Sequence, residues 1–135
     1  MNAFFLIWVI GVGAVITAQD KATVGDFTKS ATEHIINQLE QPFVVKSVMG
    51  TVSRKQGDRE PLPNVLFEIQ GPGGDRQIRR TLTDKHGRFK LGHVPEGTYK
   101  FKATLNGFQS VTGTITVSKT LRKRDEIRIE MAVGV

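Results

Sequence analysis

Residues 98–105 read TYKFKATL, and this stretch decides the fold class because apolar and polar side chains alternate along it. One side of an extended chain here carries only apolar groups, namely Tyr99, Phe101, Ala103 and Leu105. A period of two residues is typical of a β-strand with one buried face and one face in water. We therefore expect Lys100 and Lys102, which alternate with the apolar set, to point into solvent.

The same alternation recurs in six further stretches of the chain. They lie at about residues 43–52, 65–69, 78–82, 89–91, 108–118 and 125–133. Clusters of Gly, Pro, Asn and Asp separate them and indicate turns. Seven short strands at this spacing predict an all-β fold, a seven-stranded antiparallel Greek-key sandwich. The alternation also puts Val44 on the same face as Val48 and Val52, and Glu68 in water.

A set of apolar side chains is expected to fill the space between two sheets. The set is Val48, Val52, Val65, Phe67, Phe89, Tyr99, Phe101, Ile127 and Ile129. The hydroxyl of Tyr99 is expected to reach a backbone group, since a buried phenol needs a partner. Gly50 lies within a strand, which indicates the close approach of another backbone. In the turn that follows residue 83, Asp84 is expected to accept hydrogen bonds from backbone N–H groups, and Gly87 to adopt a positive φ.

The chain starts with an apolar run, NAFFLIWVIGVGAVITA at residues 2–18, which holds no charged side chain. Its length is typical of a secretion signal and short for a membrane span. We expect export with cleavage after Ala18, so that the mature chain begins at Gln19; an uncleaved membrane anchor is the alternative. An exported chain without cysteine favours a bacterial envelope, in the periplasm or outside the cell.

Residues 19–42 are predicted to form a linker that contains one short helix. Ser30 and Glu33 fit a capping box. Apolar residues follow at helical spacing, namely Ile35, Ile36 and Leu39. Pro42 closes the pattern, so the helix is expected over about residues 31–40. The predicted organisation is a signal peptide at 1–18, this linker at 19–42, and one sandwich domain at 43–135.

Five short motifs follow a known family pattern in order and spacing. They are Val48–Val52, Pro61–Val65, Thr83–Phe89, Val94–Tyr99 and Asn106–Phe108. In these motifs the chain closely resembles the carboxypeptidase regulatory-like domain over about residues 44–133. The resemblance implies a transthyretin-like (prealbumin-like) sandwich, grouped with carbohydrate-binding-like folds, and an accessory role rather than a catalytic one.

The composition argues against an enzyme. The chain has 135 residues and no cysteine, which excludes disulfides, thiolate metal sites and cysteine nucleophiles. This length also leaves no room for the zinc-bearing catalytic domain of a carboxypeptidase. His34, His86 and His93 lack metal-ligand spacing, and no Ser-His-Asp set accompanies a nucleophile turn. We expect no catalytic residue, no metal and no cofactor.

Basic side chains are the remaining indication of a binding function. Lys and Arg number 19 against 13 Asp and Glu, which gives a net charge of +6. The candidates for a basic binding face are Arg76, Arg79, Arg80, Arg88, Lys90, Lys100, Lys102, Arg122, Lys123 and Arg124. If the strands around Arg88 and Lys100 share a sheet, their outward side chains form one cationic surface. The expected partners are an anionic glycan, a lipid headgroup or an envelope protein. Predicted export and few aromatic side chains disfavour nucleic acid. A solvated face that only maintains solubility is the alternative.

These observations predict an exported, non-catalytic β-sandwich module that binds a protein or glycan in the cell envelope. Carbohydrate binding usually uses an aromatic stacking platform, and Phe43 and Phe108 are the aromatic side chains that remain for it. A purely structural spacer or assembly domain of the envelope or outer membrane is the alternative, and an uncharacterised enzyme is a minor one. The sequence leaves the ligand and the oligomeric state open.

Overall fold

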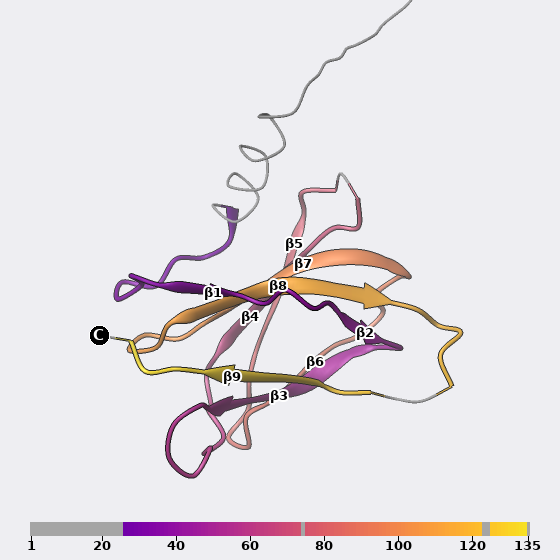
Figure 1. The fold of residues 1–135 in the computed structure, drawn as a ribbon. Coiled ribbons are helices and arrows are strands. Elements are labelled where there is room, and N and C mark those ends of the chain that lie inside the picture. The colour runs from indigo at the N-terminus through magenta and orange to yellow at the C-terminus, as the bar shows by residue number, and fades with distance from the viewer. Residues whose placement is uncertain (1–25, 74, 123–124, 135) are drawn as a thin grey trace, which may run out of the picture.

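Two β-sheets stacked face to face make up the computed structural model, which describes residues 26–73, 75–122 and 125–134 (Figure 1). The strands are β1 (Ile36–Gln38), β2 (Phe43–Val45), β3 (Val48–Arg54), β4 (Leu66–Gln70), β5 (Ile78–Leu82), β6 (Arg88–Leu91), β7 (Gly97–Thr104), β8 (Ser110–Val117) and β9 (Ile127–Met131). The larger sheet has the order β1-β8-β7-β4-β5, with β2 also paired to β8, and the smaller has the order β6-β3-β9. The predicted all-β sandwich is confirmed, and these residue ranges contain no helix long and apolar enough to cross a membrane. The predicted signal peptide lies outside the described residues.

The core lies between the sheets, and all of the predicted core residues are buried in it. Phe67 of β4 stacks on Phe89 of β6 with ring centroids 4.1 Å apart, which joins the two sheets directly. Phe101 of β7 lies beside the same ring at 5.7 Å. The period-two pattern therefore located the inward face of each of these strands correctly.

The strand count and the strand directions differ from the prediction. The stretch 43–52 is two strands, because the chain leaves β2 at the edge of the larger sheet and enters β3 in the smaller one. This change of sheet breaks the alternation, so Val44 is exposed and its neighbour Val45 is buried. Three pairings are parallel, β1 and β2 with β8 and β3 with β9, so both sheets are mixed rather than antiparallel.

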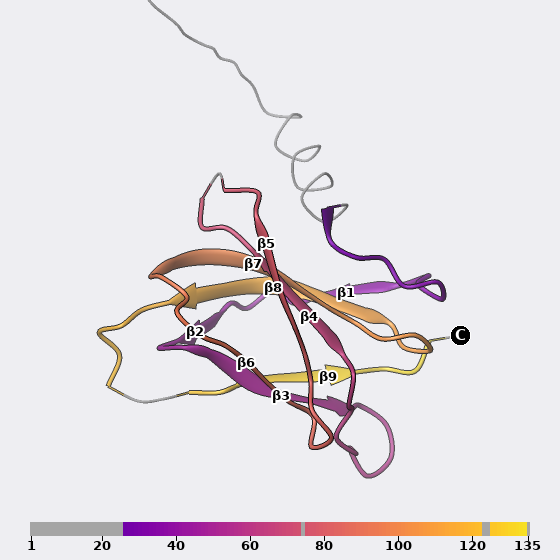
Figure 2. The ribbon, with the colours of Figure 1, turned by 180° about the vertical axis from the view of Figure 1, so that it is seen from behind.

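The helix predicted over residues 31–40 is wrong, because this segment is extended. Residues 26–45, here called the N-terminal strap, cross the outer face of the larger sheet and then run along the edge of β8 (Figures 1 and 2). The Leu39 N–H donates to the Thr112 carbonyl oxygen at 2.8 Å. Pairing with β8 and the side-chain contacts of the strap override a local helix signal, which is worth little by itself.

The prediction that Lys102 points into solvent is also wrong. Its side chain is only 2% exposed, because the strap covers it and the Lys102 ammonium lies 2.8 Å from the Glu33 carboxylate. The Ser110 hydroxyl donates to the same carboxylate. Burial alone would raise the pKa of Glu33, but the hydrogen bonds from Lys102 and Ser110 outweigh it and lower that pKa.

Glu68, expected in water, is fully buried on the same outer face. The N–H and hydroxyl of Thr28 in the strap each donate to its carboxylate at 2.9 Å. Arg80 of β5 donates to it at 2.7 Å. A polar layer therefore lies between the strap and the larger sheet, and each of its two buried carboxylates is paired with a cation.

The predicted turn and strand details are confirmed. Asp84 accepts hydrogen bonds from the N–H groups of His86 and Arg88 at 2.8 and 3.0 Å, and these bonds lower the pKa of its carboxyl group. Gly87 has a φ of 73°. The Tyr99 hydroxyl donates to the Pro95 carbonyl oxygen at 2.6 Å. A β-carbon at Gly50 would overlap the carbonyl oxygen of Ile127 on the adjacent strand β9.

Candidate binding surfaces

The structure divides the predicted basic face among several places. Lys100 and Lys102 lie on β7 in the larger sheet, whereas Arg88 and Lys90 lie on β6 in the smaller one. The condition for one cationic surface, that these strands share a sheet, is therefore not met. Arg122 is exposed in the loop after β8, and the predicted site residues Lys123 and Arg124 lie outside the described residues.

Three of the predicted basic residues make structural contacts instead. Arg76 lies 3.7 Å from the carboxylate of Asp26 in the strap. Arg80 is the partner of the buried Glu68. Arg79 donates to the Gly92 carbonyl oxygen at 2.7 Å, which ties β5 to the loop after β6. These side chains stabilise the edges of the sandwich, and they do not gather on one face.

A different cationic surface lies on the outer face of the smaller sheet. Thr51 of β3 is in register with Arg88 of β6 on one side and with Arg128 of β9 on the other. Lys90 lies next along β6, beside Met49. We call Arg88, Lys90 and Arg128, with Thr51 and Met49 between them, the basic sheet face. Side chains at paired positions point to the same side of a sheet, so this row is coplanar.

The geometry of the basic sheet face follows from the strand spacing. Arg88 and Arg128 are two strands apart, which places their α-carbons about 10 Å from each other. The side chain of Arg128 is 80% exposed, and its guanidinium lies 4.0 Å from the Glu126 carboxylate, a distance at which an exposed pair is weak. Glu130, on the same side of β9, pairs with Arg59 at 3.4 Å. The face therefore keeps an excess of positive charge in open solvent.

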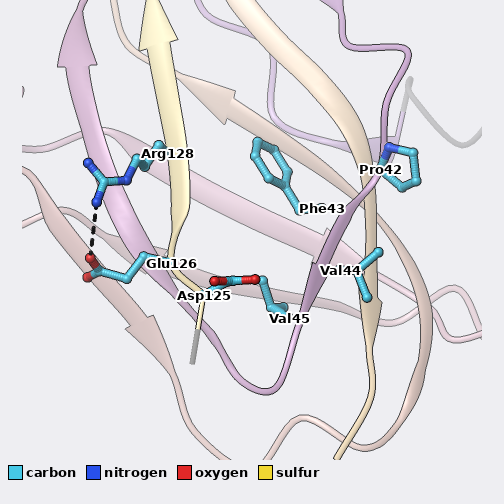
Figure 3. Close-up of a pocket in the computed structure, with 7 residues that line it drawn as sticks. All are labelled: Pro42, Phe43, Val44, Val45, Asp125, Glu126 and Arg128. Carbon is cyan, nitrogen blue, oxygen red and sulfur yellow. Dashed lines mark ion pairs between the residues drawn. The ribbon is translucent and has the colours of Figure 1, made fainter. Parts of the chain in front are cut away.

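A groove lies beside this face, between β2 and the start of β9 (Figure 3). Its volume is about 380 Å³, and it is lined by Pro42, Phe43, Val44, Val45, Asp125, Glu126 and Arg128. The Phe43 ring packs against Phe101 with centroids 5.9 Å apart, so it belongs partly to the core. Arg128 borders both the groove and the basic sheet face, which makes the two surfaces continuous.

The three histidines, His34, His86 and His93, are all exposed and lie on separate segments. In the part of the chain that the structure describes, no three His, Cys, Asp or Glu side chains gather as metal ligands.

Sequence reasoning missed Arg128 as a surface residue of interest. The alternation in DEIRIEM places it outward, and that signal was available. Its place beside Thr51 depends on the parallel pairing of β3 with β9, which joins segments far apart in the sequence. No local pattern carries that information.

Two mixed sheets around one core, with an open charged face, define a β-sandwich module. Residues 47–131 match the family model of the carboxypeptidase regulatory-like domain. The chain belongs to this family, as the motif resemblance predicted.

Comparisons with curated proteins and with solved structures give no further relative close enough to indicate a function. A search of curated proteins found no match. Among solved structures, the chain is similar to a 3-chlorocatechol 1,2-dioxygenase from Rhodococcus opacus 1CP, at 13% identity and a TM-score of 0.45, over 80% of this chain and 68% of that one. It is also similar to a mutant catechol 1,2-dioxygenase from Acinetobacter radioresistens, at 10% identity and a TM-score of 0.46, over 90% and 69%. These likenesses carry no argument about chemistry.

Proposed function

We propose that this protein is an exported, non-catalytic β-sandwich module that binds an anionic glycan of the cell envelope on its basic sheet face. The observation that carries the proposal is the row Arg88–Thr51–Arg128 across the smaller sheet. Exposed like charges on one sheet face repel, and a counter-charged partner removes that cost. Membership of a regulatory-like family supports the non-catalytic part.

The chemistry of the face suits a carboxylated or sulfated sugar chain. A guanidinium offers a planar fork that matches such groups with two parallel hydrogen bonds. The Thr51 hydroxyl between the two arginines can bond to sugar hydroxyls. The residues of this face include no aromatic ring, so recognition rests on charge rather than on stacking.

The experiment compares two variants of equal charge on immobilised polygalacturonate, with neutral dextran as the blank. Arg88→Gln/Arg128→Gln removes the two guanidinium groups of the basic sheet face. Lys29→Gln/Lys100→Gln removes two charges from the side of the larger sheet and serves as the control. We expect the first variant to lose about tenfold in affinity, which corresponds to roughly 1.4 kcal/mol. Equal binding by both variants would contradict a binding role for the basic sheet face and would favour the alternative, a structural spacer.

Two further measurements separate the alternatives. Binding should weaken steeply between about 0.1 M and roughly 0.5 M salt, because exposed charges are screened over about 10 Å or less in that range. Anionic lipid vesicles and an extract of envelope proteins replace the polysaccharide in parallel samples. Binding to either of these, with none to polygalacturonate, assigns the face to that other partner.

Export is the second part of the proposal, and the apolar run at residues 2–18 supports it. N-terminal sequencing of the protein recovered from its native compartment should begin at Gln19. Recovery of membrane-bound protein that retains Met1 would instead support an uncleaved anchor.

A further inference from the structure

Among the described strands the larger sheet ends at β1, a strand of three residues whose outer edge carries no charged side chain, proline or bulge. Edge strands are normally shielded by charge, proline or a bulge, because their free N–H and C=O groups attract other chains. β1 reads INQ and carries none of these. Ile35, Ile36 and Leu39, in and around the strand, are all exposed apolar side chains. Such an edge is suited to pairing with another strand.

The direction of the free backbone groups follows from the pairing with β8. The Leu39 N–H donates to Thr112 of β8. Backbone groups alternate in direction along a strand, so those of Asn37 also face β8, whereas those of Ile36 and Gln38 point away from it. The outer edge therefore presents both an N–H and a C=O group at each of these two residues.

We propose that two copies of this chain pair edge to edge through antiparallel β1 strands, related by a two-fold axis at Asn37. In this register Ile36 lies opposite the partner's Gln38, and each of these residues has its backbone groups free on that edge. Residues exchanging both hydrogen bonds in this way form the hydrogen-bonded pairs of an antiparallel ladder. A two-fold axis makes the contact closed and self-complementary.

The side chains around Asn37 are complementary in the same register. Ile35 lies opposite the partner's Leu39, an apolar pair at a position where side chains approach closely. His34 lies opposite the partner's Glu40, a base against an acid. An axis at Ile36 or Gln38 would keep the free backbone groups aligned but would lose both the Ile35–Leu39 pair and the base–acid pair. A register shift of one residue would lose both pairs and also set the free groups of one copy against residues whose backbone groups face β8. The sequence HIINQLE is therefore self-complementary only about its centre.

The edge is also held in place before pairing. The Asn37 amide donates to the Gln109 side-chain oxygen at 2.8 Å. The buried Glu33–Lys102 pair anchors the strap just before β1. A strand already fixed on its own sheet loses little conformational freedom when a second copy docks.

Cysteine cross-linking tests this register directly, because the natural chain has no cysteine. The full chain with Asn37→Cys brings two α-carbons to about 4.5 Å across the axis, within the range of a disulfide. In the matched control Gln38→Cys the two α-carbons lie about 9 Å apart, beyond that range. Under mild oxidation at equal micromolar concentration, we expect Asn37→Cys to form covalent dimer at least tenfold faster. Equal rates, or no dimer from either variant, would overturn the proposal.

Sedimentation equilibrium without any cross-link provides the second test. Gln38→Pro removes an outward N–H group and leaves the hydrogen bonds to β8 intact, so it should raise the dimer dissociation constant at least tenfold, whereas Gln38→Thr should not. Glu40→Lys should weaken the dimer, and His34→Glu/Glu40→Lys should restore it, since that double change reverses the pair. A dissociation constant that none of these changes alters would refute the β1 interface. Thermal melting of each variant confirms that it is folded.

Discussion

Removal of the buried partner of Lys102 should destabilise the protein strongly. In Glu33→Gln the Lys102 ammonium stays under the strap without the carboxylate that lies 2.8 Å from it. Breaking a buried ion pair at one partner costs about 3–5 kcal/mol, because the remaining charge has lost its solvent and its counter-charge. The glutamine oxygen can still accept one hydrogen bond, so we expect the lower end, about 3 kcal/mol.

Urea denaturation measures this loss. With a slope of about 1.5 kcal/mol per molar urea, the unfolding midpoint should fall by about 2 M. Glu60→Gln is the matched control outside the strap and outside the β1 edge, where the exposed side chain should change stability by less than about 0.5 kcal/mol. In a double-mutant cycle, Glu33→Gln/Lys102→Met should be more stable than Glu33→Gln alone, because no unpaired charge remains. A loss below about 1 kcal/mol for Glu33→Gln would show that the strap does not bury Lys102.

Three other predictions follow from the core, the sheet contact and the acid group of the strap. Phe101→Ala should cost about 3–5 kcal/mol in unfolding free energy, and a loss under about 1 kcal/mol would place this ring outside the core. Gly50→Val should lower the melting temperature strongly, because a side chain there overlaps the backbone of Ile127; an unchanged melting temperature would rule out this close approach. The pKa of Glu33 is lowered from 4.5 on folding, so its contribution is present above the unfolded value and is lost as pH falls through the folded one. The stability gap between wild type and Glu33→Gln, measured by urea denaturation, should therefore shrink in acid, and a gap that widens would contradict this assignment.

The sequence predicted the inner half of the fold better than its outer surface. Phe67, Phe89 and Phe101 are placed correctly because an alternating pattern records which side of a strand is apolar. The Asp84 turn is likewise encoded locally, since its hydrogen bonds join residues at most four apart.

The outer surface depends on contacts that no local pattern records. Lys102 and Glu68 alternate with core residues and were expected in water, but a segment far away in the sequence covers them. The strap has a capping pattern and apolar residues at helical spacing, but it pairs with β8 as an edge strand instead. Arg88 and Lys90 of the basic sheet face were predicted as binding residues, but Arg128 was missed for the same reason, because parallel pairing brings it beside Thr51.

The central claim, that the basic sheet face binds an anionic glycan, is tested most directly by NMR. Amide chemical shifts of the labelled protein are followed during titration with oligogalacturonate. We predict that the largest changes fall on β3, β6 and β9, centred on Thr51, Arg88 and Arg128, and that they disappear on addition of roughly 0.5 M salt. Shifts that centre instead on the outer face of the larger sheet, or no shifts at all, would contradict the proposed function.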